Sequence, residues 1–538
     1  MEDKAFNLLY ERWIKVLNLN GETEEVSLLN VLERAHELRC LAGELPTQDV
    51  AILRLLLATL YATFTRADAQ GNRKPIENAP DALSRWQSLW ELKHFPIEPI
   101  KSRLCHYEDR FYLFHPERPF YQVAGLDRGT DYRAAKLLGN LSESGNKVRL
   151  FPVRTGIAKQ SLSYAEATRW LLYLNAFDDT SSKPSVRGQG MPSPGAGWLG
   201  KLGIIFAHGN NLFETLMLNF VLLNDNGEPW HNGQAIWEIE APRTDERVEI
   251  ALPQDWLSIL TLQSRRLLLK REGNNVSGYR LLGGDFFPKE NAFTEQMTLW
   301  RKDSNQDIYN PKRHDPSRQL WRDFSAFLAE GESFRRPGIV RWLSTLQSRG
   351  YIDRILTFQI ASVKYGDKDF FVTDVFQDSL TINANMISRL GQEWVTRIIG
   401  LLTITEDSIK QLSFLAADLA KASGDSDSTH HRVGEGTGSA AKAEAYFRLD
   451  KPFRKWLADI DPATTDIDEA EQGWKNTVRQ TLLRLGEEMT HQSGEKAIIG
   501  RWVETKKGNR KENKLYTAPG AFIRFRSRIL HLTEKGGL

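Results

Sequence analysis

The sequence predicts an α+β protein in which a large mixed α/β domain, residues 1–377, precedes a four-helix bundle, residues 378–538. Three observations support this division. Strand-like and helix-like segments are interspersed up to about residue 377. Beyond that point the apolar residues recur at helical spacing only. The chain of 538 residues is also too long for one core, since a domain usually holds about 100 to 200 residues.

The first elements of the large domain follow from turn and capping signals. Residues 13–28 alternate in polarity and turn at Asn20-Gly21, which predicts a β-hairpin. Ser27 is then expected to cap a short helix. Thr47 is expected to cap a longer helix over residues 49–64, whose apolar residues cover almost the whole circumference. That helix should therefore be buried on most sides.

The rest of the large domain is expected to alternate between helices and strands. Helical patterns cover residues 82–92 and 164–177. Residues 267–282 form a second expected hairpin around Gly273-Asn274-Asn275. Single strands are expected at residues 202–206, 236–240 and 248–252.

The C-terminal domain is expected to be entirely helical. Glycine-rich segments separate the helical patterns, and no convincing strand lies between them. Helices joined by short loops pack antiparallel, so a bundle of about four helices follows. Its helices are expected at residues 380–423, 440–460, 469–490 and 521–532.

Composition limits the class of protein. With 41% hydrophobic and 26% charged residues, the chain is typical of a soluble globular protein. It contains no run of about 18 apolar residues and no signal sequence, so we expect a cytoplasmic protein without a membrane partner. Cys40 and Cys105 give neither zinc spacing nor a disulfide framework, so no metal and no cofactor is expected.

A glycine-rich loop at residues 185–201 is the most unusual segment, with five glycines and two prolines. Glycine lets the backbone approach a ligand closely, although a solvated connector is equally compatible with this composition. The loop contains a G-x-G-x-x-G at residues 195–200. A proline-rich stretch precedes it and an expected strand follows it, which is the wrong context for a dinucleotide site.

Two basic stretches indicate where nucleic acid could bind, because the net charge of +2 provides no global field. Residues 147–159 carry four basic and no acidic side chains, and residues 500–538 carry ten Lys or Arg against three Glu. Each stretch is either a solvated face or a set of phosphate contacts. Their proximity to a glycine loop in one chain favours phosphate contacts.

Motifs for catalysis are absent from the sequence. It has no G-x-S-x-G elbow, H-E-x-x-H, P-loop or paired Cys motif. His314-Asp315, and His430 and His431 with Asp425 and Asp427, could bind a metal ion, but surface loops explain both groups better. A binding subunit is therefore favoured over an enzyme.

Three stretches, residues 6–16, 43–58 and 111–122, resemble the large subunit of the type I-E CRISPR Cascade complex, the CasA family. The resemblance covers essentially the whole chain. It implies a non-catalytic subunit that recognises the protospacer-adjacent motif in double-stranded DNA, promotes duplex opening and helps recruit a helicase-nuclease. The implied partners are the other Cascade subunits, the CRISPR guide RNA, target double-stranded DNA and the helicase-nuclease acting in trans.

The resemblance also assigns the two neighbouring loops. Residues 150–154 match the family's motif-contacting loop, and residues 186–191 of the glycine loop match the segment that lies in the DNA minor groove. A backbone in the minor groove distinguishes little beyond A·T and G·C, so motif preference should be relaxed. The implied DNA-binding residues are Lys147, Arg149, Phe151, Val153 and Arg154 in the first stretch and Arg187, Gly188, Gln189, Gly190 and Met191 in the second.

A third family element is a wedge that usually carries Gln and separates base pairs. The matching turn here, residues 364–368, lacks Gln, so Lys368 or Asp367 would take its place beside Tyr365 and Gly366. An ordinary hairpin turn is the alternative interpretation.

Other basic residues are assigned less directly. Arg280 and Lys289 are the nearest matches to the family's minor-groove lysine, and Arg524, Arg526 and Arg528 are candidates for guiding a DNA strand. Because residues two apart on a helix lie on different faces, at least one of these three arginines should serve packing or a salt bridge. Phe114, Phe120 and Tyr121 are expected in the core rather than on bases.

Two alternative functions remain open. The protein could be an assembly scaffold whose basic stretches contact only partner subunits and guide RNA. It could also be a nuclease that uses His314 and Asp315 with a distant acid.

Overall fold

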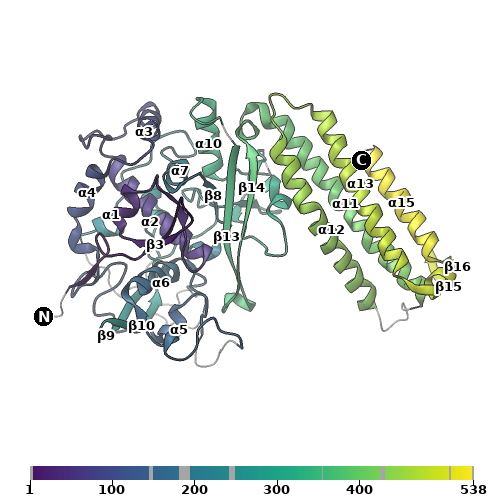
Figure 1. Ribbon diagram of the computed structural model, residues 1–538, viewed down its shortest axis with the longest axis horizontal. Coiled ribbons are helices and arrows are strands. Elements are labelled where there is room, and N and C mark those ends of the chain that lie inside the picture. The colour runs from purple at the N-terminus through teal and green to yellow at the C-terminus, as the bar shows by residue number, and fades with distance from the viewer. Residues whose placement is uncertain are drawn as a thin grey trace. The chain divides into compact units, whose positions relative to one another are not determined.

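The computed structural model describes residues 4–143, 150–180, 194–240, 249–331, 333–353, 355–424, 431–507 and 510–535. The chain forms two compact units (Figure 1). The first comprises Met1–Leu320, Ala326–Ile352 and Leu356–Leu380, and the second comprises Trp321–Ser325, Asp353–Ile355 and Thr381–Leu538.

Two short segments from within the expected first domain thus group with the second unit. Trp321 shows why, because its ring stacks on Phe453 with centroids 4.7 Å apart. Its indole Nε1 also donates a hydrogen bond to Asp450 Oδ1 at 2.8 Å.

The first unit begins with a three-stranded antiparallel sheet. Its strands are β2 (Ile14–Asn18), β3 (Thr23–Val26) and β4 (Leu38–Leu41), in the order β3-β2-β4. The β2–β3 hairpin confirms the predicted turn at Asn20-Gly21. Helix α1 (Leu28–Glu33) begins after Ser27, whose hydroxyl accepts the N–H of Asn30 at 3.2 Å, so the predicted cap is also confirmed.

Helix α2 (Pro46–Phe64) forms the centre of the first unit, and 17 of its 19 residues are buried, as expected. The predicted cap was wrong. Leu45 occupies the cap position without a side-chain hydrogen bond, and Thr47 lies inside the first turn with its hydroxyl unpartnered among the described residues. Pro46 explains the earlier start, because its fixed φ suits the first helical position.

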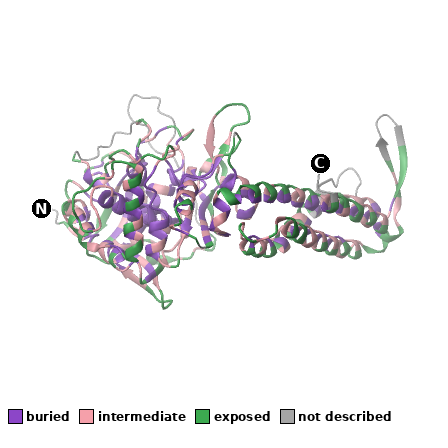
Figure 2. Cartoon of the chain, turned by 90° about the horizontal axis from the view of Figure 1, so that it is seen from above, coloured by how far each residue is buried: buried purple, intermediate pink, exposed green. Residues whose placement is uncertain are grey.

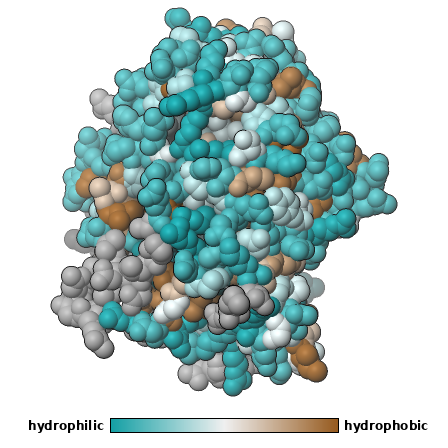
Figure 3. All heavy atoms as spheres, turned by 90° about the vertical axis from the view of Figure 1, so that its left-hand side faces the viewer, coloured by the Kyte–Doolittle hydropathy of each residue, from teal (hydrophilic) through white to brown (hydrophobic). Residues whose placement is uncertain are grey.

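Short helices surround α2, which packs against α4 (Ile97–Cys105), α6 (Tyr164–Phe177), α7 (Leu212–Leu218) and α8 (Trp256–Leu260). The helices predicted at residues 82–92 and 164–177 are confirmed as α3 (Ala79–Leu92) and α6. Buried residues fill the interior of this unit (Figure 2). The face presented in Figure 3 is mostly hydrophilic, with apolar residues in small separate groups.

A four-stranded sheet contains the second predicted hairpin. Strands β9 (Arg265–Glu272) and β10 (Asn275–Gly283) form it, and β10 also pairs with β6 (Thr130–Arg133) and β7 (Leu162–Ser163). The remaining short elements here are β1 (Ala5–Asn7) paired with β5 (Tyr112–Phe114), β11 (Trp300–Lys302) paired with β12 (Tyr309–Pro311), and the helices α5 (Ala134–Leu137), α9 (Phe324–Leu328) and α10 (Gly338–Ser348).

A three-stranded sheet of order β14-β13-β8 completes the first unit, with β8 (Ile205–His208), β13 (Ile355–Tyr365) and β14 (Val372–Asn383). The strand expected at residues 202–206 therefore begins only at Ile205 and continues to His208. The strand expected at 236–240 was wrong, because Ile236–Glu238 forms a 3-10 turn. Glu238 stabilises that turn by accepting the N–H of Ala235 and binding Arg66 and Arg103. The described residues 249–252 form only an isolated bridge, at Glu249.

The described residues of the second unit form four long helices: α11 (Gln392–Ser423), α12 (His431–Asp459), α13 (Ile467–His491) and α15 (Ala518–Lys535). Helix α11 packs against the other three, and α13 packs against α12 and α15. Trp474 Nε1 donates to Thr405 Oγ1 at 3.0 Å within this core. Among the described helices of the chain, none is long and apolar enough to span a membrane.

The prediction of no strand in this region was wrong. Between α13 and α15 lie the short helix α14 (Gly494–Ile499) and a hairpin of β15 (Arg501–Lys507) and β16 (Arg510–Tyr516). The two strands are rich in Lys, Arg and Glu and have no continuous apolar face, so the alternation that marks a half-buried strand is missing.

Candidate nucleic-acid interface

The loop at residues 150–157 exposes four large apolar side chains. Leu150, Phe151, Val153 and Ile157 are 91%, 92%, 70% and 79% exposed. Exposed apolar groups this close together are typical of a binding surface. Phe151 and Val153 therefore lie where a partner could reach them, as the sequence predicted, and their role in DNA binding stays a prediction.

The basic residues around this loop are less free than the sequence suggested. Arg154 forms an ion pair with Glu166 in the first turn of α6, and Lys159 forms one with Glu143 at 2.7 Å. The stretch that lacks acidic residues in sequence thus meets acidic partners in space. Lys147 and Arg149 lie outside the described residues.

Residues 187–191 of the glycine loop, from Arg187 to Met191, also lie outside the described part of the chain. The later glycines are described and serve packing. Gly197 N donates to Asp178 O at 2.8 Å, and a Cβ at Gly197 would lie 2.4 Å from Ala176 O. This close approach of two backbones explains the glycine there without a nucleotide.

The turn between β13 and β14 presents two of the predicted wedge residues to solvent, since Asp367 and Lys368 are exposed. Lys368 and Asp369 adopt left-handed backbone conformations, with φ of 52° and 59°. Such conformations are costly for residues other than glycine and persist only where the surroundings hold them.

Two contacts hold this turn. Arg313 binds the Asp369 carboxylate with both guanidinium nitrogens, at 2.8 and 2.9 Å. Thr180 donates its N–H to Asp369 O at 2.9 Å and its hydroxyl to Lys368 O at 2.6 Å. The residue that precedes the 181–193 segment in sequence is therefore bound to the turn that carries the predicted wedge.

Tyr365 does not lie on the exposed surface of the turn. Its ring is buried and its hydroxyl donates to Phe177 O at 2.7 Å. Burial raises the pKa of this hydroxyl well above its usual value. Tyr365 therefore supports the turn from beneath, which corrects its assignment as a DNA contact. A Cβ at the neighbouring Gly366 would lie 2.7 Å from the ring of Phe371.

Arg280 is bound within the first unit. It binds the Asp131 carboxylate at 2.8 and 3.2 Å, together with the carbonyl oxygens of Leu126 and Asp127. Arg280 and Lys270 lower the pKa of Asp131 to about 2. Lys289, the other candidate for the minor-groove lysine, is exposed.

Of the three arginines on α15, Arg524 forms an ion pair within the protein, and Arg526 and Arg528 face solvent. Arg524 binds Asp418 on α11 at 2.8 Å, which confirms that at least one of them forms a salt bridge. Arg528 lies 5.5 Å from the ring centre of Phe414, and both Arg526 and Arg528 are exposed.

Sequence reasoning missed a cationic group around Tyr516. Lys421, Lys514 and Arg524 lie 5.1, 5.3 and 5.6 Å from the ring centre. They come from α11, β16 and α15, so no local stretch of sequence shows the group.

The candidate catalytic residues His314 and Asp315 form hydrogen bonds within the protein. His314 is buried with Nε2 2.9 Å from Ile204 O, and Asp315 accepts the N–H and hydroxyl of Ser317. These hydrogen bonds from Ser317 lower the pKa of Asp315. Among the described residues, no three His, Cys, Asp or Glu side chains are grouped to hold a metal ion. Residues 425–430 lie outside this description.

The aromatic residues of the 111–121 stretch are largely structural. Phe120 and Tyr121 are buried, as predicted, whereas Phe114 is half-buried against Tyr164 with ring centres 4.8 Å apart. The guanidinium of Arg271 also lies 5.4 Å from the ring centre of Phe114. All three aromatic side chains thus pack within the first unit.

A cavity of about 400 Å³ in the first unit is lined by residues of β4, α2, α7, β8, β13 and β14. Neither Lys nor Arg is among the described residues that line it, so it suits a neutral or cationic group and not an anion. Asp49 accepts the N–H of Gly43 at 2.8 Å, and burial raises the pKa of its carboxyl to about 7.

Comparison with known proteins identifies the family. The model of the CRISPR-associated protein Cse1 family matches residues 7–485. A CRISPR-associated protein CasA/Cse1 of Thermus thermophilus is 30% identical over 505 residues, which cover 88% of this chain and 93% of that protein.

Solved structures agree with this match. Cse1 of Thermobifida fusca superposes with a TM-score of 0.81 at 28% identity and covers 99% of both chains. A chain of a CRISPR RNA-guided surveillance complex shares the fold, with a TM-score of 0.71 at 18% identity over 98% of this chain and all of that chain. The protein therefore belongs to the Cse1 (CasA) family of CRISPR-associated proteins.

Proposed function

We propose that this protein is a non-catalytic subunit of Cascade, an RNA-guided surveillance complex. It recognises the protospacer-adjacent motif in double-stranded DNA, promotes opening of the duplex and helps recruit the helicase-nuclease. Its partners are the other Cascade subunits, the guide RNA and the target duplex. Membership of the Cse1 family and the fold shared with a surveillance-complex chain support this proposal.

We infer that the functions divide between the two domains expected from the sequence, although Trp321–Ser325 and Asp353–Ile355 group with the second unit. Residues 1–377 carry the motif-reading loops, and residues 378–538 form the family's four-helix bundle. In such RNA-guided systems the protein reads only a short motif, while base pairing with the guide reads the target. The protein therefore needs only a small groove-reading surface and an element that starts strand separation.

One observation carries the proposal. The turn after β13 is held in a strained conformation by Arg313 and Thr180, and it directs Lys368 and Asp367 into solvent. A rigid, exposed turn of this kind suits insertion between base pairs, because the surrounding contacts have already fixed its backbone. Lys368 is the proposed wedge.

The wedge is tested by Lys368→Ala in the assembled complex. We expect the rate of duplex opening, followed by 2-aminopurine fluorescence beside the motif, to fall about tenfold, while initial duplex binding changes little. Lys101→Ala, at an exposed lysine on α4, is the matched control. An opening rate equal to that of the control would show that the wedge lies elsewhere.

Substitutions at Gly188 and Gly190 test whether the backbone of the glycine loop lies close to the DNA minor groove. Replacing either glycine with Leu should reduce target-duplex affinity at least tenfold without disrupting the complex, because a side chain would separate backbone and groove. Gel shifts on duplexes with and without candidate motifs measure the effect. Unchanged target-duplex affinity in both variants would refute close contact between this backbone and the groove.

An assembly scaffold is the second candidate function. The exposed apolar side chains of residues 150–157 favour it, since such a surface suits a protein partner as well as DNA. The same gel shifts separate the two functions, because a scaffold predicts equal affinity of the complex for every motif.

A further inference from the structure

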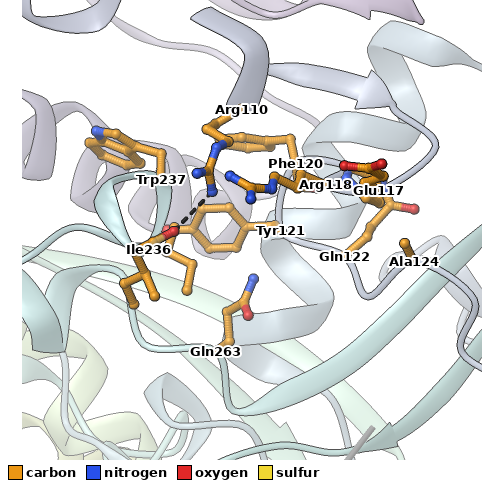
Figure 4. A pocket seen from close by; sticks show the side chains of 12 residues that line it. Arg110, Glu117, Arg118, Phe120, Tyr121, Gln122, Ala124, Ile236, Trp237 and Gln263 are labelled. Atoms are coloured by element: carbon orange, nitrogen blue, oxygen red, sulfur yellow. Dashed lines mark hydrogen bonds between the residues drawn. The ribbon is translucent and has the colours of Figure 1, made fainter. Parts of the chain in front are cut away.

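A small pocket in the first unit lies between residues 110–124 and residues 236–239 (Figure 4). Its volume is about 50 Å³. Pockets for nucleobases and drug-sized ligands measure about 300 to 1,000 Å³, so this one admits only a few atoms. It suits a single small ion or one terminal group of a larger molecule.

Two arginines line this pocket, and neither forms an ion pair with a described acidic residue. Arg110 donates a hydrogen bond to Ile239 O at 2.9 Å. The guanidinium of Arg118 forms no hydrogen bond or ion pair with any residue described. Burial, and then the charge of Arg118, lower the pKa of Arg110. Glu117 lines the exposed rim but forms no ion pair with either arginine in the described chain.

The third group is a buried amide. Gln263 is 3% exposed, its amide Nε2 donates to no described residue, and its Oε1 also has no described partner. In Figure 4 the amide nitrogen of Gln263 points toward the pocket from the side opposite the arginines, while the amide oxygen points away from them. A buried polar group without a partner costs free energy, and such groups call for an unrecorded partner.

The backbone that carries Arg118 is rigidly held. Gln122 is buried, donates to Leu113 O at 2.7 Å and accepts the N–H of Leu269 at 2.8 Å. Tyr121, which lines the pocket, has a φ of 55°. This left-handed conformation is strained for tyrosine, and such strain persists where the surrounding structure requires it. The backbone close to Arg118 is therefore fixed by contacts within the first unit.

We propose that this pocket binds one phosphate-type oxyanion between the guanidinium groups of Arg110 and Arg118, with the amide Nε2 of Gln263 as a third donor. Three donors from separate directions suit a tetrahedral ion. A carboxylate would be satisfied by one guanidinium fork. The phosphate comes either from the backbone of a nucleic-acid strand or from solution. The site does not depend on motif recognition, so the two proposals can fail separately.

The test uses the full chain and inorganic phosphate at constant ionic strength, followed by isothermal titration calorimetry. Arg118→Gln should weaken phosphate binding about tenfold or more, because a charged hydrogen-bond donor is lost. Arg349→Gln, at an exposed arginine without a described side-chain partner, is the matched control and should bind as the unmodified protein does.

A second variant keeps the test decisive if Arg118→Gln folds poorly. Gln263→Met removes the unpartnered amide, so it should raise the unfolding midpoint in phosphate-free buffer and weaken phosphate binding. If Gln263 had only a packing role, its replacement would not both raise the unfolding midpoint and weaken phosphate binding. Phosphate affinity unchanged in Gln263→Met, or equal in Arg118→Gln and Arg349→Gln, would overturn the proposal.

The source of the phosphate is decided by repeating the titration with a saturating 20-nucleotide single-stranded RNA. Loss of the phosphate signal assigns the site to a strand phosphate, and an unchanged signal assigns it to inorganic phosphate. Absence of phosphate binding together with loss of a partner subunit in Arg118→Gln would instead assign the pocket to a partner's carboxylate and overturn the proposal.

Discussion

At the level of single residues, several basic side chains form ion pairs inside the protein and are not available to nucleic acid. Arg54 binds Glu295 at 2.8 Å with both side chains almost fully buried. Arg266 binds Asp285 at 2.6 Å in the same way. Removing one partner of a buried pair costs about 3 to 5 kcal/mol, because the other charge remains buried. The charge of a stretch of sequence therefore overstates the free charge of the folded surface.

Asp49 gives a prediction at this scale. Its pKa is about 7 in the folded protein and about 3.9 in the unfolded chain, so stability falls as the pH rises between these values. Asp49→Asn keeps the acceptor for Gly43 and removes the titration. The variant should match the unmodified protein near pH 4 and exceed its unfolding free energy at pH 8, by up to about 4 kcal/mol.

Chemical denaturation across pH 4–8 measures this difference. Asp374→Asn, at an exposed position on β14, is the control and should keep the original pH profile. Parallel profiles for Asp49→Asn and the unmodified protein would show that Asp49 stays ionised in the fold.

At the level of helices and strands, local sequence patterns predicted the structure correctly where contacts between neighbouring residues determine it. The hairpin at Asn20-Gly21 and the Ser27 cap formed as predicted, because their hydrogen bonds join residues a few positions apart. Thr47 failed as a cap because Pro46 set an earlier helix start. Residues 236–238 failed as a strand because Arg66 and Arg103, distant in sequence, bind Glu238.

Helix α13 offers a prediction with an internal control. A Cβ at Gly486 would lie 2.4 Å from the ring of Phe525 on α15, whereas a Cβ at Gly473 meets nothing within 4 Å. Gly486→Ala should destabilise the second unit by about 1 to 3 kcal/mol through overpacking. Gly473→Ala should stabilise it by up to about 1 kcal/mol through helix propensity.

Thermal unfolding followed by circular dichroism distinguishes these effects. If both alanine variants stabilised the protein equally, the close packing of α13 against α15 at Gly486 would be wrong.

At the scale of the whole molecule, each unit has its own core. Helix α2 lies at the centre of the first, and residues such as Trp474 and Phe453 lie at the centre of the second. We expect calorimetry to resolve two unfolding transitions, because separate cores unfold as separate cooperative units. Asp49→Asn should shift one transition and Gly486→Ala the other. A single transition shifted by both variants would contradict independent units.

The family, the mixed first part and the mostly helical last part could be predicted from the sequence, since these depend on periodicity and on motifs along the chain. Part of the candidate site was also readable, including the exposed Phe151 and Lys368. The folded structure was needed to show that Tyr365 is buried, that Arg154 and Arg280 form ion pairs with acidic residues, and that Arg110 and Arg118 share a pocket with Gln263. Burial and ion pairing join residues far apart in sequence, and no local pattern records which of them meet.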